Sequence, residues 1–209
     1  MFCFCCWSGY SQDLYIKTGK NFVAYNFTSS EGVSNPYLER ETGNSYELGY
    51  SFPFKKLHRF SYDVSITLNE LNASVGLSQT SVKYKTEYAG IQNSIAFSFL
   101  KSNRFALDVT SGLNVSALVY GKQEVNGQLF DLENIDGFKQ VLVQPTLGLE
   151  ANLYASKQLY LSFGYVYSYS LNKVKFPEKF SIQTSQFSLG VHFLIQPIVH
   201  KIKSLEDEN

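Results

Sequence analysis

Three histidines, His58, His192 and His200, are the residues with most potential for catalysis. A serine nucleophile needs a histidine and a carboxylate within hydrogen-bond reach of its hydroxyl. His58 falls in an expected turn and His200 in the C-terminal segment, so only His192 has an expected inward strand position. Ser188 on the same face lies about 13 Å away along an extended strand, too far for a direct pair. We therefore expect that the protein is not an enzyme.

Charged residues form a second candidate site, because they occur at positions that alternate with apolar ones. The residues are Glu47, Arg59, Asp63, Asp108 and Glu150, together with Lys17. One interpretation of such a face is a gate or an ion path. The interpretation we favour is a network of paired charges that fills an interior and satisfies its buried polarity.

The sequence shows no pattern of metal ligands. All three cysteines, Cys3, Cys5 and Cys6, lie in the first six residues, and the histidines are scattered. Metal sites need several such ligands at close spacing. We expect no cofactor.

The N-terminal segment has features of a secretory signal peptide. Residues 2–7 are apolar, and the small residues Gly9 and Ser11 follow at the spacing of a cleavage site. The segment has no positive n-region and its apolar run is short, so we expect the true start to lie upstream. We therefore expect residues 1–11 to be a truncated signal peptide, residues 12–195 an outer-membrane β-barrel domain, and residues 196–209 a short periplasmic tail.

Composition limits the class of protein. The 209 residues have zero formal net charge, which gives no basic footprint for nucleic acid. No apolar run approaches the roughly 20 residues of a transmembrane helix. If the chain spans a membrane, it must do so as a closed barrel.

Eight stretches alternate apolar and polar residues with period two, the pattern of strands with two different faces. In the clearest one, Leu113 and Val115 share one face while Gly112 and Asn114 share the other. The eight stretches are residues 14–27, 44–54, 58–70, 82–100, 104–120, 140–155, 159–172 and 182–195.

Short and long connections alternate along the chain. The short turns are residues 55–57, 101–103 and 156–158; the long loops are roughly 28–43, 71–81, 121–139 and 173–181. Three-residue turns keep the apolar faces of partner strands on one side. The pairs that they predict are Phe54 with His58, Leu100 with Arg104 and Phe99 with Phe105, and Ala155 with Leu159. The alternation of short turns with long loops is typical of outer-membrane barrels, which have short periplasmic turns and longer extracellular loops.

Aromatic residues gather near both ends of the expected strands, as in the aromatic girdles of membrane barrels. Near the short turns these are Phe52, Phe54, Phe60, Tyr62, Phe97, Phe99 and Phe105; toward the long loops they are Tyr46, Tyr167 and Tyr169. The core of a soluble β-sandwich is the alternative explanation.

A soluble lipocalin-like barrel that binds a small apolar ligand is the chief rival fold. A strand face in bulk water tends to carry Lys and Glu, whereas the polar face here is mostly Gly, Ser, Thr, Asn and Gln. Such small residues suit the narrow lumen of an eight-stranded barrel. The Gly-x-Trp pattern of a lipocalin first strand is absent. The membrane barrel is therefore favoured.

Three stretches resemble small outer-membrane β-barrel proteins of the OmpA/OmpX-like type, often labelled the porin family. They are Leu14-Tyr15-Ile16-Lys17-Thr18-Gly19, residues 88–120, and Ser188-Leu189-Gly190-Val191-His192-Phe193-Leu194-Ile195. The last is similar to the final-strand signal read by the outer-membrane assembly machinery, with Gly190, Phe193 and Ile195 as its key residues. Tyr88-Ala89-Gly90-Ile91-Gln92 departs from the more apolar family segment, and fourteen residues follow Ile195 where many such barrels end.

The resemblance implies an eight-stranded antiparallel up-and-down transmembrane β-barrel in the cell outer membrane of a Gram-negative bacterium. Its partners would be outer-membrane lipids, the assembly machinery and an extracellular ligand or partner protein. Eight strands leave no open channel, which argues against bulk diffusion. We expect a structural or interaction role through the extracellular loops, in membrane integrity, adhesion or partner binding. A narrow porin-type channel is a further alternative.

Overall fold

The computed structural model describes residues 12–28, 38–54, 57–77, 80–132, 141–171, 174–175 and 179–195. Its strands are β1 (Gln12–Thr28), β2 (Leu38–Pro53), β3 (Phe60–Glu70), β4 (Ala73–Leu77), β5 (Thr80–Lys101), β6 (Phe105–Val125), β7 (Gln128–Asp131), β8 (Leu142–Tyr154), β9 (Leu159–Tyr169), β10 (Val174–Lys175) and β11 (Lys179–Ile195). The expected signal segment 1–11 and tail 196–209 lie outside the described residues. No helix in the described ranges is long and apolar enough to cross a membrane.

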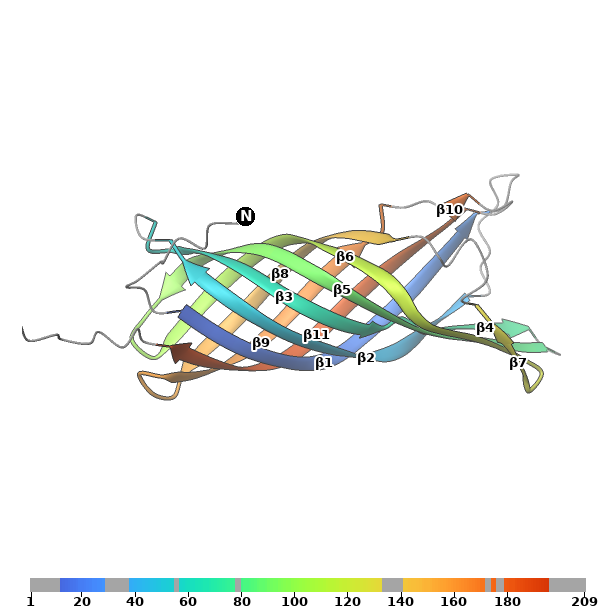
Figure 1. Cartoon of the computed structure of the whole chain (residues 1–209), viewed down its shortest axis with the longest axis horizontal. Helices are drawn as coiled ribbons and strands as arrows, with labels where there is room; N and C mark the ends of the chain where they lie inside the picture. Colours follow the sequence, from blue (N-terminus) through green and yellow to red (C-terminus); the bar gives the residue numbers. More distant parts are fainter. Residues whose placement is uncertain are drawn as a thin grey trace, which may run out of the picture.

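Eight long strands form a closed ring (Figure 1). Around the ring the order is β1, β2, β3, β5, β6, β8, β9 and β11, and every neighbouring pair is antiparallel. The ring closes because β11 pairs with β1 over their whole length, from Gln12 opposite Ile195 to Thr28 opposite Lys179. The expected all-β, eight-stranded up-and-down barrel is confirmed.

The strands are staggered around the ring. Successive Cα partners lead from Asp13 through β2, β3, β5, β6, β8, β9 and β11 back to β1 at Val23, ten residues farther along. A stagger of this kind requires the strands to tilt by roughly 35–45° from the barrel axis. The lumen of so small a barrel is only wide enough for side chains.

The two faces of the ring have opposite polarity. Outward-facing aliphatic side chains are exposed, for example Ile66 at 65%, Leu189 at 62% and Leu147 at 59%. The inward neighbours Thr67 and Ser188 are only 4% and 6% exposed. A water-soluble barrel has the reverse arrangement, since burial of apolar surface drives its folding.

The three short connections gather at one end of the barrel, here called the turn end, together with Gln12 and Ile195. The third turn is as predicted, because the Ala155 amide donates to the Leu159 carbonyl at 3.1 Å. In the first turn the prediction was wrong: the Phe54 amide donates to the Phe60 carbonyl at 2.9 Å, so Phe54 does not pair with His58. This turn is two residues longer, which leaves the inward and outward faces unchanged.

The second turn also differs from the prediction. Leu100 lies opposite Leu107 rather than Arg104, because the register shifts between Ser98 and Leu100. The unpaired extra residue at this bulge is Phe99, so Phe99 does not pair with Phe105. Beyond the bulge the register keeps the predicted faces.

At the opposite, loop end, β5 and β6 continue beyond the ring (Figure 1), and β6 turns back there into β7 to form a projecting hairpin. β4 pairs with β5 and β7 pairs with β6 inside the expected loops 71–81 and 121–139, which therefore contain strands. The turn before β7 is Asn126-Gly127, with φ of 49° and 81°. An Asn-Gly pair is the preferred two-residue hairpin turn, and this signal was missed in the sequence.

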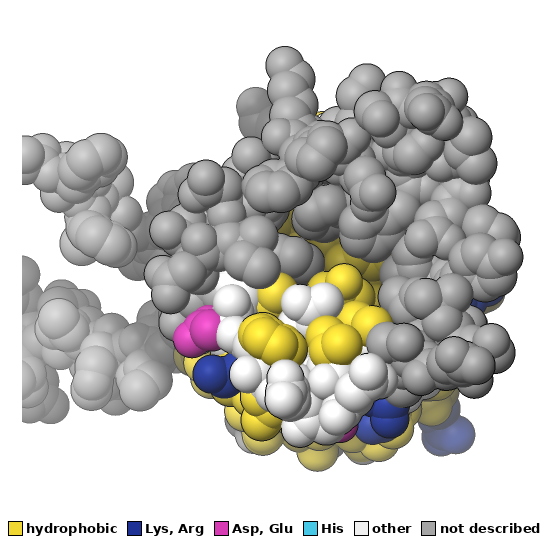
Figure 2. All heavy atoms as spheres, turned by 90° about the vertical axis from the view of Figure 1, so that its right-hand side faces the viewer, with side chains coloured by type: hydrophobic (Ala, Val, Ile, Leu, Met, Phe, Trp, Pro, Cys, Tyr) yellow, Lys and Arg dark blue, Asp and Glu magenta, His cyan; other side chains and the backbone are white. Residues whose placement is uncertain are grey.

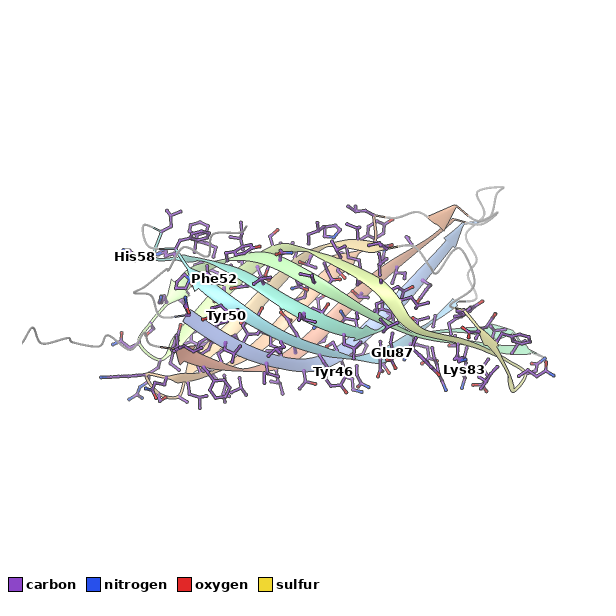
Figure 3. The ribbon with its side chains drawn as sticks, viewed as in Figure 1. Tyr46, Tyr50, Phe52, His58, Lys83 and Glu87 are labelled. Atoms are coloured by element: carbon purple, nitrogen blue, oxygen red, sulfur yellow. The ribbon has the colours of Figure 1, made fainter. Side chains whose placement is uncertain are left out.

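Phe52 and Tyr46, one member of each expected aromatic band, lie at different levels of the barrel (Figure 3). Tyr50 and Phe52 lie toward the turn end, where His58 occupies the first turn, and Tyr46 lies farther toward the loop end (Figure 3). Tyr46 is 49% exposed on the outward face. Glu87 and Lys83 of β5 lie still farther toward the loop end than Tyr46 (Figure 3).

Candidate functional site

The candidate site is the polar lumen, at whose centre an ion pair joins opposite walls. Lys17 Nζ of β1 lies 2.5 Å from Glu150 Oε2 of β8, and their side chains are 13% and 14% exposed. β1 and β8 are not neighbours in the ring, so this contact crosses the lumen. Lys17 Nζ also lies 4.6 Å from the centroid of the Tyr15 ring, which adds a cation–π contact.

Two more of the predicted acidic residues surround this ion pair. Glu47 Oε1 accepts hydrogen bonds from the Tyr15 hydroxyl at 3.0 Å and the Ser65 hydroxyl at 2.8 Å. Asp63 accepts one from Ser61 at 3.3 Å. Glu47, Asp63, Glu150 and Lys17 line one cavity of about 20 Å³. The structure thus brings three of the predicted acids together around Lys17.

The remaining two predicted charges lie elsewhere. Asp108 faces inward nearer the turn end, where its Oδ2 accepts a hydrogen bond from Asn152 Nδ2 at 2.7 Å. Arg59, contrary to expectation, lies in the exposed turn between β2 and β3 and does not face the lumen. The cause is the longer first turn, since β3 begins at Phe60 rather than at residue 58.

His192 has more buried partners than its position on one strand predicted. Its Nε2 lies 2.9 Å from Ser162 Oγ, and its Nδ1 lies 3.1 Å from Asp13 Oδ2. Asp13 also accepts a hydrogen bond from the Tyr160 hydroxyl. The His192 ring is stacked between Tyr15 and Tyr160, at centroid distances of 5.0 and 4.2 Å.

This cluster was missed because partners were sought only along the strand that carries His192. Its actual partners come from the two neighbouring strands, β9 and β1. In the register of the ring, His192 lies opposite Tyr160 of β9 and Tyr15 of β1, and Ser162 and Asp13 each lie two residues from these on the same strands. The signal in the sequence was the order of the eight stretches. If each pairs with the next and the last pairs with the first, these residues come to lie side by side.

The connection from Asp13 through His192 to Ser162 resembles that of a hydrolytic triad, but its surroundings are tightly packed. All three residues are buried, with exposures of 4%, 2% and 3%. A Cβ added to Gly190 would lie only 2.4 Å from Ser162 Oγ and 3.2 Å from His192 Nε2. The hydroxyl therefore packs against the β11 backbone, which leaves no room on that side for a substrate acyl group.

The middle of the lumen is filled by side chains. A second cavity there, lined by residues that include Asn114 and Gln144, again measures about 20 Å³. A single water molecule needs roughly 10–15 Å³ of such space. Among the described residues, the lumen widens at the turn end, in a cavity of about 460 Å³ lined by Asp13, Asp108 and Tyr160 among others.

An apolar cluster closes the loop end of the lumen. Its buried residues are Val23, Tyr25, Leu71, Ala73, Tyr88, Leu132, Leu142 and Ile182. The Tyr25 hydroxyl donates to the Leu71 carbonyl at 2.9 Å, which ties β1 to the segment after β3. Figure 2, which views this end, shows hydrophobic side chains gathered in its centre.

No group of three or more His, Cys, Asp or Glu side chains among the described residues is arranged to hold a metal ion. The predicted final-strand signal lies on β11, which closes the ring. Phe193 and Ile195 point outward, 45% and 44% exposed, and Gly190 points inward opposite Ser162.

Comparison with known proteins supports the fold. The chain matches no protein-family model, and no curated protein matches it. It is similar to the crystal structure of Neisserial surface protein A, with a TM-score of 0.53 and 14% identity over 87% of this chain and 97% of that one. It is also similar to the outer-membrane protease OmpT of Escherichia coli, with a TM-score of 0.53 and 6% identity over 90% and 98% of the two chains. The attachment invasion locus protein Ail of Yersinia pestis aligns with a TM-score of 0.44 and 12% identity over 88% and 100%.

At these identities the comparisons establish the fold alone. The chain has the fold of small outer-membrane β-barrel proteins, as its resemblance to the OmpA/OmpX-like type implied. One of the similar structures is a protease, so the fold is compatible with catalysis. Whether this chain is an enzyme must be argued from its own residues.

Proposed function

We propose that this protein resides in the outer membrane of a Gram-negative bacterium as a closed barrel that anchors an external interaction surface. The observation that carries the proposal is the inverted polarity of the ring. Aliphatic side chains such as Ile66 and Leu189 are more than 60% exposed, while inward residues such as Thr67 and Asn114 are 4% exposed. Lipid is the environment in which such an outer face is stable.

The filled middle of the lumen argues against a lipocalin-like barrel that binds an apolar ligand and against a narrow channel. A pocket for a small apolar ligand usually measures roughly 300–1,000 Å³, whereas the two mid-lumen cavities are about 20 Å³ each. The cavity of about 460 Å³ at the turn end is lined largely by polar residues, such as Asp108 and Asn152, which do not suit an apolar ligand. A narrow channel would need a continuous aqueous path. The Lys17–Glu150 pair in the middle and the apolar cluster at the loop end both interrupt such a path.

The proposed role involves no catalysis. Ser162 has the partners of a nucleophile, but it is 3% exposed and packs against Gly190. The cluster of Asp13, His192 and Ser162 joins β1, β9 and β11 through side chains, and its role is to hold the barrel seam closed. Catalysis would require that a substrate reach the Ser162 hydroxyl, and the packing around this cluster does not allow it.

The projecting hairpin is the interaction element of the proposal. β5 and β6 carry it beyond the ring, and β7 pairs only with β6, so one edge of β7 has no neighbouring strand in the described sheet. Leu129 and Phe130 on β7 are 66% and 48% exposed. Exposed strand edges with apolar side chains bind extended segments of partner proteins. During insertion, Gly190, Phe193 and Ile195 would be read by the assembly machinery.

Two measurements test the proposal. With a complete signal peptide, the protein should fractionate with the outer membrane, and unboiled samples should migrate differently from boiled ones on gels. Recovery as a folded soluble protein without detergent would refute the membrane location. Planar-bilayer recordings should show no steady conductance, and large stable openings would favour the channel instead.

A further inference from the structure

A groove on the outward face of the barrel near the loop end is a distinct feature of the surface. It runs over β11, where Ser185 lies between Phe22 of β1 and Tyr167 of β9 in one register row. The small side chain between two aromatic rings leaves a hollow of about 370 Å³. Phe22 and Tyr167 are 45% and 41% exposed, so the groove opens outward.

The end of the groove nearer the turn end is closed by aromatic rings. Phe187, one outward position below Ser185, contacts Phe22 edge-on at a centroid distance of 6.0 Å. It also contacts Tyr165 at 4.9 Å. The next outward residue on β11 toward the turn end is Leu189, which is 62% exposed and belongs to the apolar outer face. This end of the groove therefore lies in the part of the outer face that the proposed membrane location exposes to acyl chains.

The other end of the groove carries a cation. Arg40 of β2 lines the groove beside Ala24 of β1, and its side chain is exposed. Within the described part of the chain Arg40 makes no ion pair, and no residue that lines the groove is acidic. A second cation, Lys20, lies opposite Phe187, and its Nζ donates to Asn44 Oδ1 at 2.6 Å.

The groove also lies where the outer face changes from apolar to polar. On β1 the outward residues Leu14 and Ile16 are followed by Thr18 and Lys20. On the adjoining strands the same transition occurs at Asn44 and at Glu70, which hydrogen-bond each other at 2.9 Å. In a membrane barrel this is the level of lipid headgroups.

We propose that the groove binds one anionic phospholipid of the membrane leaflet at the loop end. The phosphate pairs with Arg40, whose planar guanidinium matches phosphate geometry with two parallel hydrogen bonds. One acyl chain lies over Ser185 between Phe22 and Tyr167 and ends against Phe187. This inference rests on the membrane location proposed above.

Native mass spectrometry of the folded barrel released from detergent micelles provides the test. The probes are phosphatidylglycerol and phosphatidylcholine with identical acyl chains. The wild-type protein should retain one phosphatidylglycerol at least about fivefold more often than phosphatidylcholine, the order expected of a charge-assisted contact. Arg40→Gln should abolish this preference and Arg40→Lys should keep part of it. Lys85→Gln, which removes an exposed charge on β5 away from the groove, should leave the preference unchanged.

A second variant tests the acyl-chain half of the site. Ser185→Phe places a ring in the hollow, so it should reduce retention of both lipids while Arg40 remains. Its folding is checked by the boiled-sample gel shift. Excess inorganic phosphate should not displace the lipid, since it lacks the acyl chain; displacement would indicate an anion site alone and overturn the lipid assignment.

Two further outcomes separate this inference from the proposed function. Equal retention of the two lipids by a barrel that inserts into vesicles, or unchanged retention by Arg40→Gln, would refute the lipid site and leave the membrane location standing. A chain that remains folded in buffer without detergent would refute both.

Discussion

The Nδ1 atom of His192 lies 3.1 Å from Oδ2 of Asp13, and this contact joins the last strand of the barrel to the first. The same carboxylate accepts a hydrogen bond from Tyr160 of β9. Three strands therefore meet through one buried acid at the seam, where the ring closes between chain ends that are distant in sequence. Backbone pairing closes the seam along its length, and these side chains fix its register.

Removal of the imidazole should weaken the barrel. In His192→Ala, Asp13 and Ser162 lose a buried partner each, which should lower the free energy of unfolding by about 1–3 kcal/mol. Urea unfolding of the protein in phospholipid vesicles measures this. His58→Ala, in the exposed first turn, is the matched control and should change stability by less than about 0.5 kcal/mol. Equal stability of the two variants would show that the seam cluster contributes nothing.

The central ion pair gives a double-variant prediction. Lys17→Met leaves Glu150 buried without its cation and should destabilise the protein by about 3–5 kcal/mol. Adding Glu150→Leu removes the uncompensated charge, so the double variant should recover most of the loss. The measurement is again the unfolding free energy in vesicles. If the double variant is as unstable as Lys17→Met or less stable, the pair is not the principal interaction of Glu150.

The fold followed from the sequence because several strands alternate clearly between apolar and polar residues. Residues such as Leu113, Asn114 and Val115 assign both faces without any tertiary information, and period-two parity survives small errors in turn length. This is why the first turn could be two residues too short in the prediction while the inward and outward faces of β3 remained correct from Phe60 onward. Parity does not fix residues next to a turn, however. Because the first turn is longer than predicted, Arg59 belongs to the turn and does not face the lumen.

The projecting hairpin and the seam cluster were not predicted, for different reasons. Residues 121–139 were expected to form a loop because Lys122, Gln123 and Glu124 are consecutive polar residues without alternation, yet β6 continues to Val125 and pairs with β7. The partners of His192 come from strands 30 and 179 residues away in sequence. Such contacts depend on the stagger of the closed ring, which single-strand patterns do not contain.

Close strand packing gives a prediction at Gly19. A Cβ added there would lie 2.1 Å from the backbone carbonyl oxygen of Phe187, which cannot move without disturbing the β1–β11 pairing. Gly19→Ala should destabilise the barrel by about 1–3 kcal/mol or more and slow its insertion. Gly164→Ala is the control, because its nearest neighbour is the Ser188 hydroxyl at 2.9 Å, which can rotate away. The unfolding midpoint and the folded fraction on unboiled gels are the measurements. Equal losses in both variants would contradict the assigned seam register.

The last prediction tests which face of the barrel contacts lipid. Val115 is 38% exposed on the outward face, whereas Asn114 is 4% exposed and donates to Thr67 Oγ1 at 2.9 Å in the lumen. A lipid-facing arginine near the bilayer midplane costs roughly 2–4 kcal/mol. Val115→Arg should therefore impair assembly more than Asn114→Asp, whose carboxylate can still accept a hydrogen bond from the Thr67 hydroxyl. The measurement is the folded fraction after refolding into vesicles.

A soluble barrel with an apolar interior would also reject Val115→Arg, so thiol labelling is needed to separate the two cases. In lipid vesicles the thiol of Val115→Cys should react with a membrane-soluble reagent and resist a water-soluble one. The thiol of Asn114→Cys should react slowly with both, because side chains from opposite walls fill the lumen around it. Fast aqueous labelling at residue 114, together with resistance to both reagents at residue 115, would mean that inside and outside are exchanged. The proposed membrane location would then be wrong, because the apolar face would be the core of a soluble barrel.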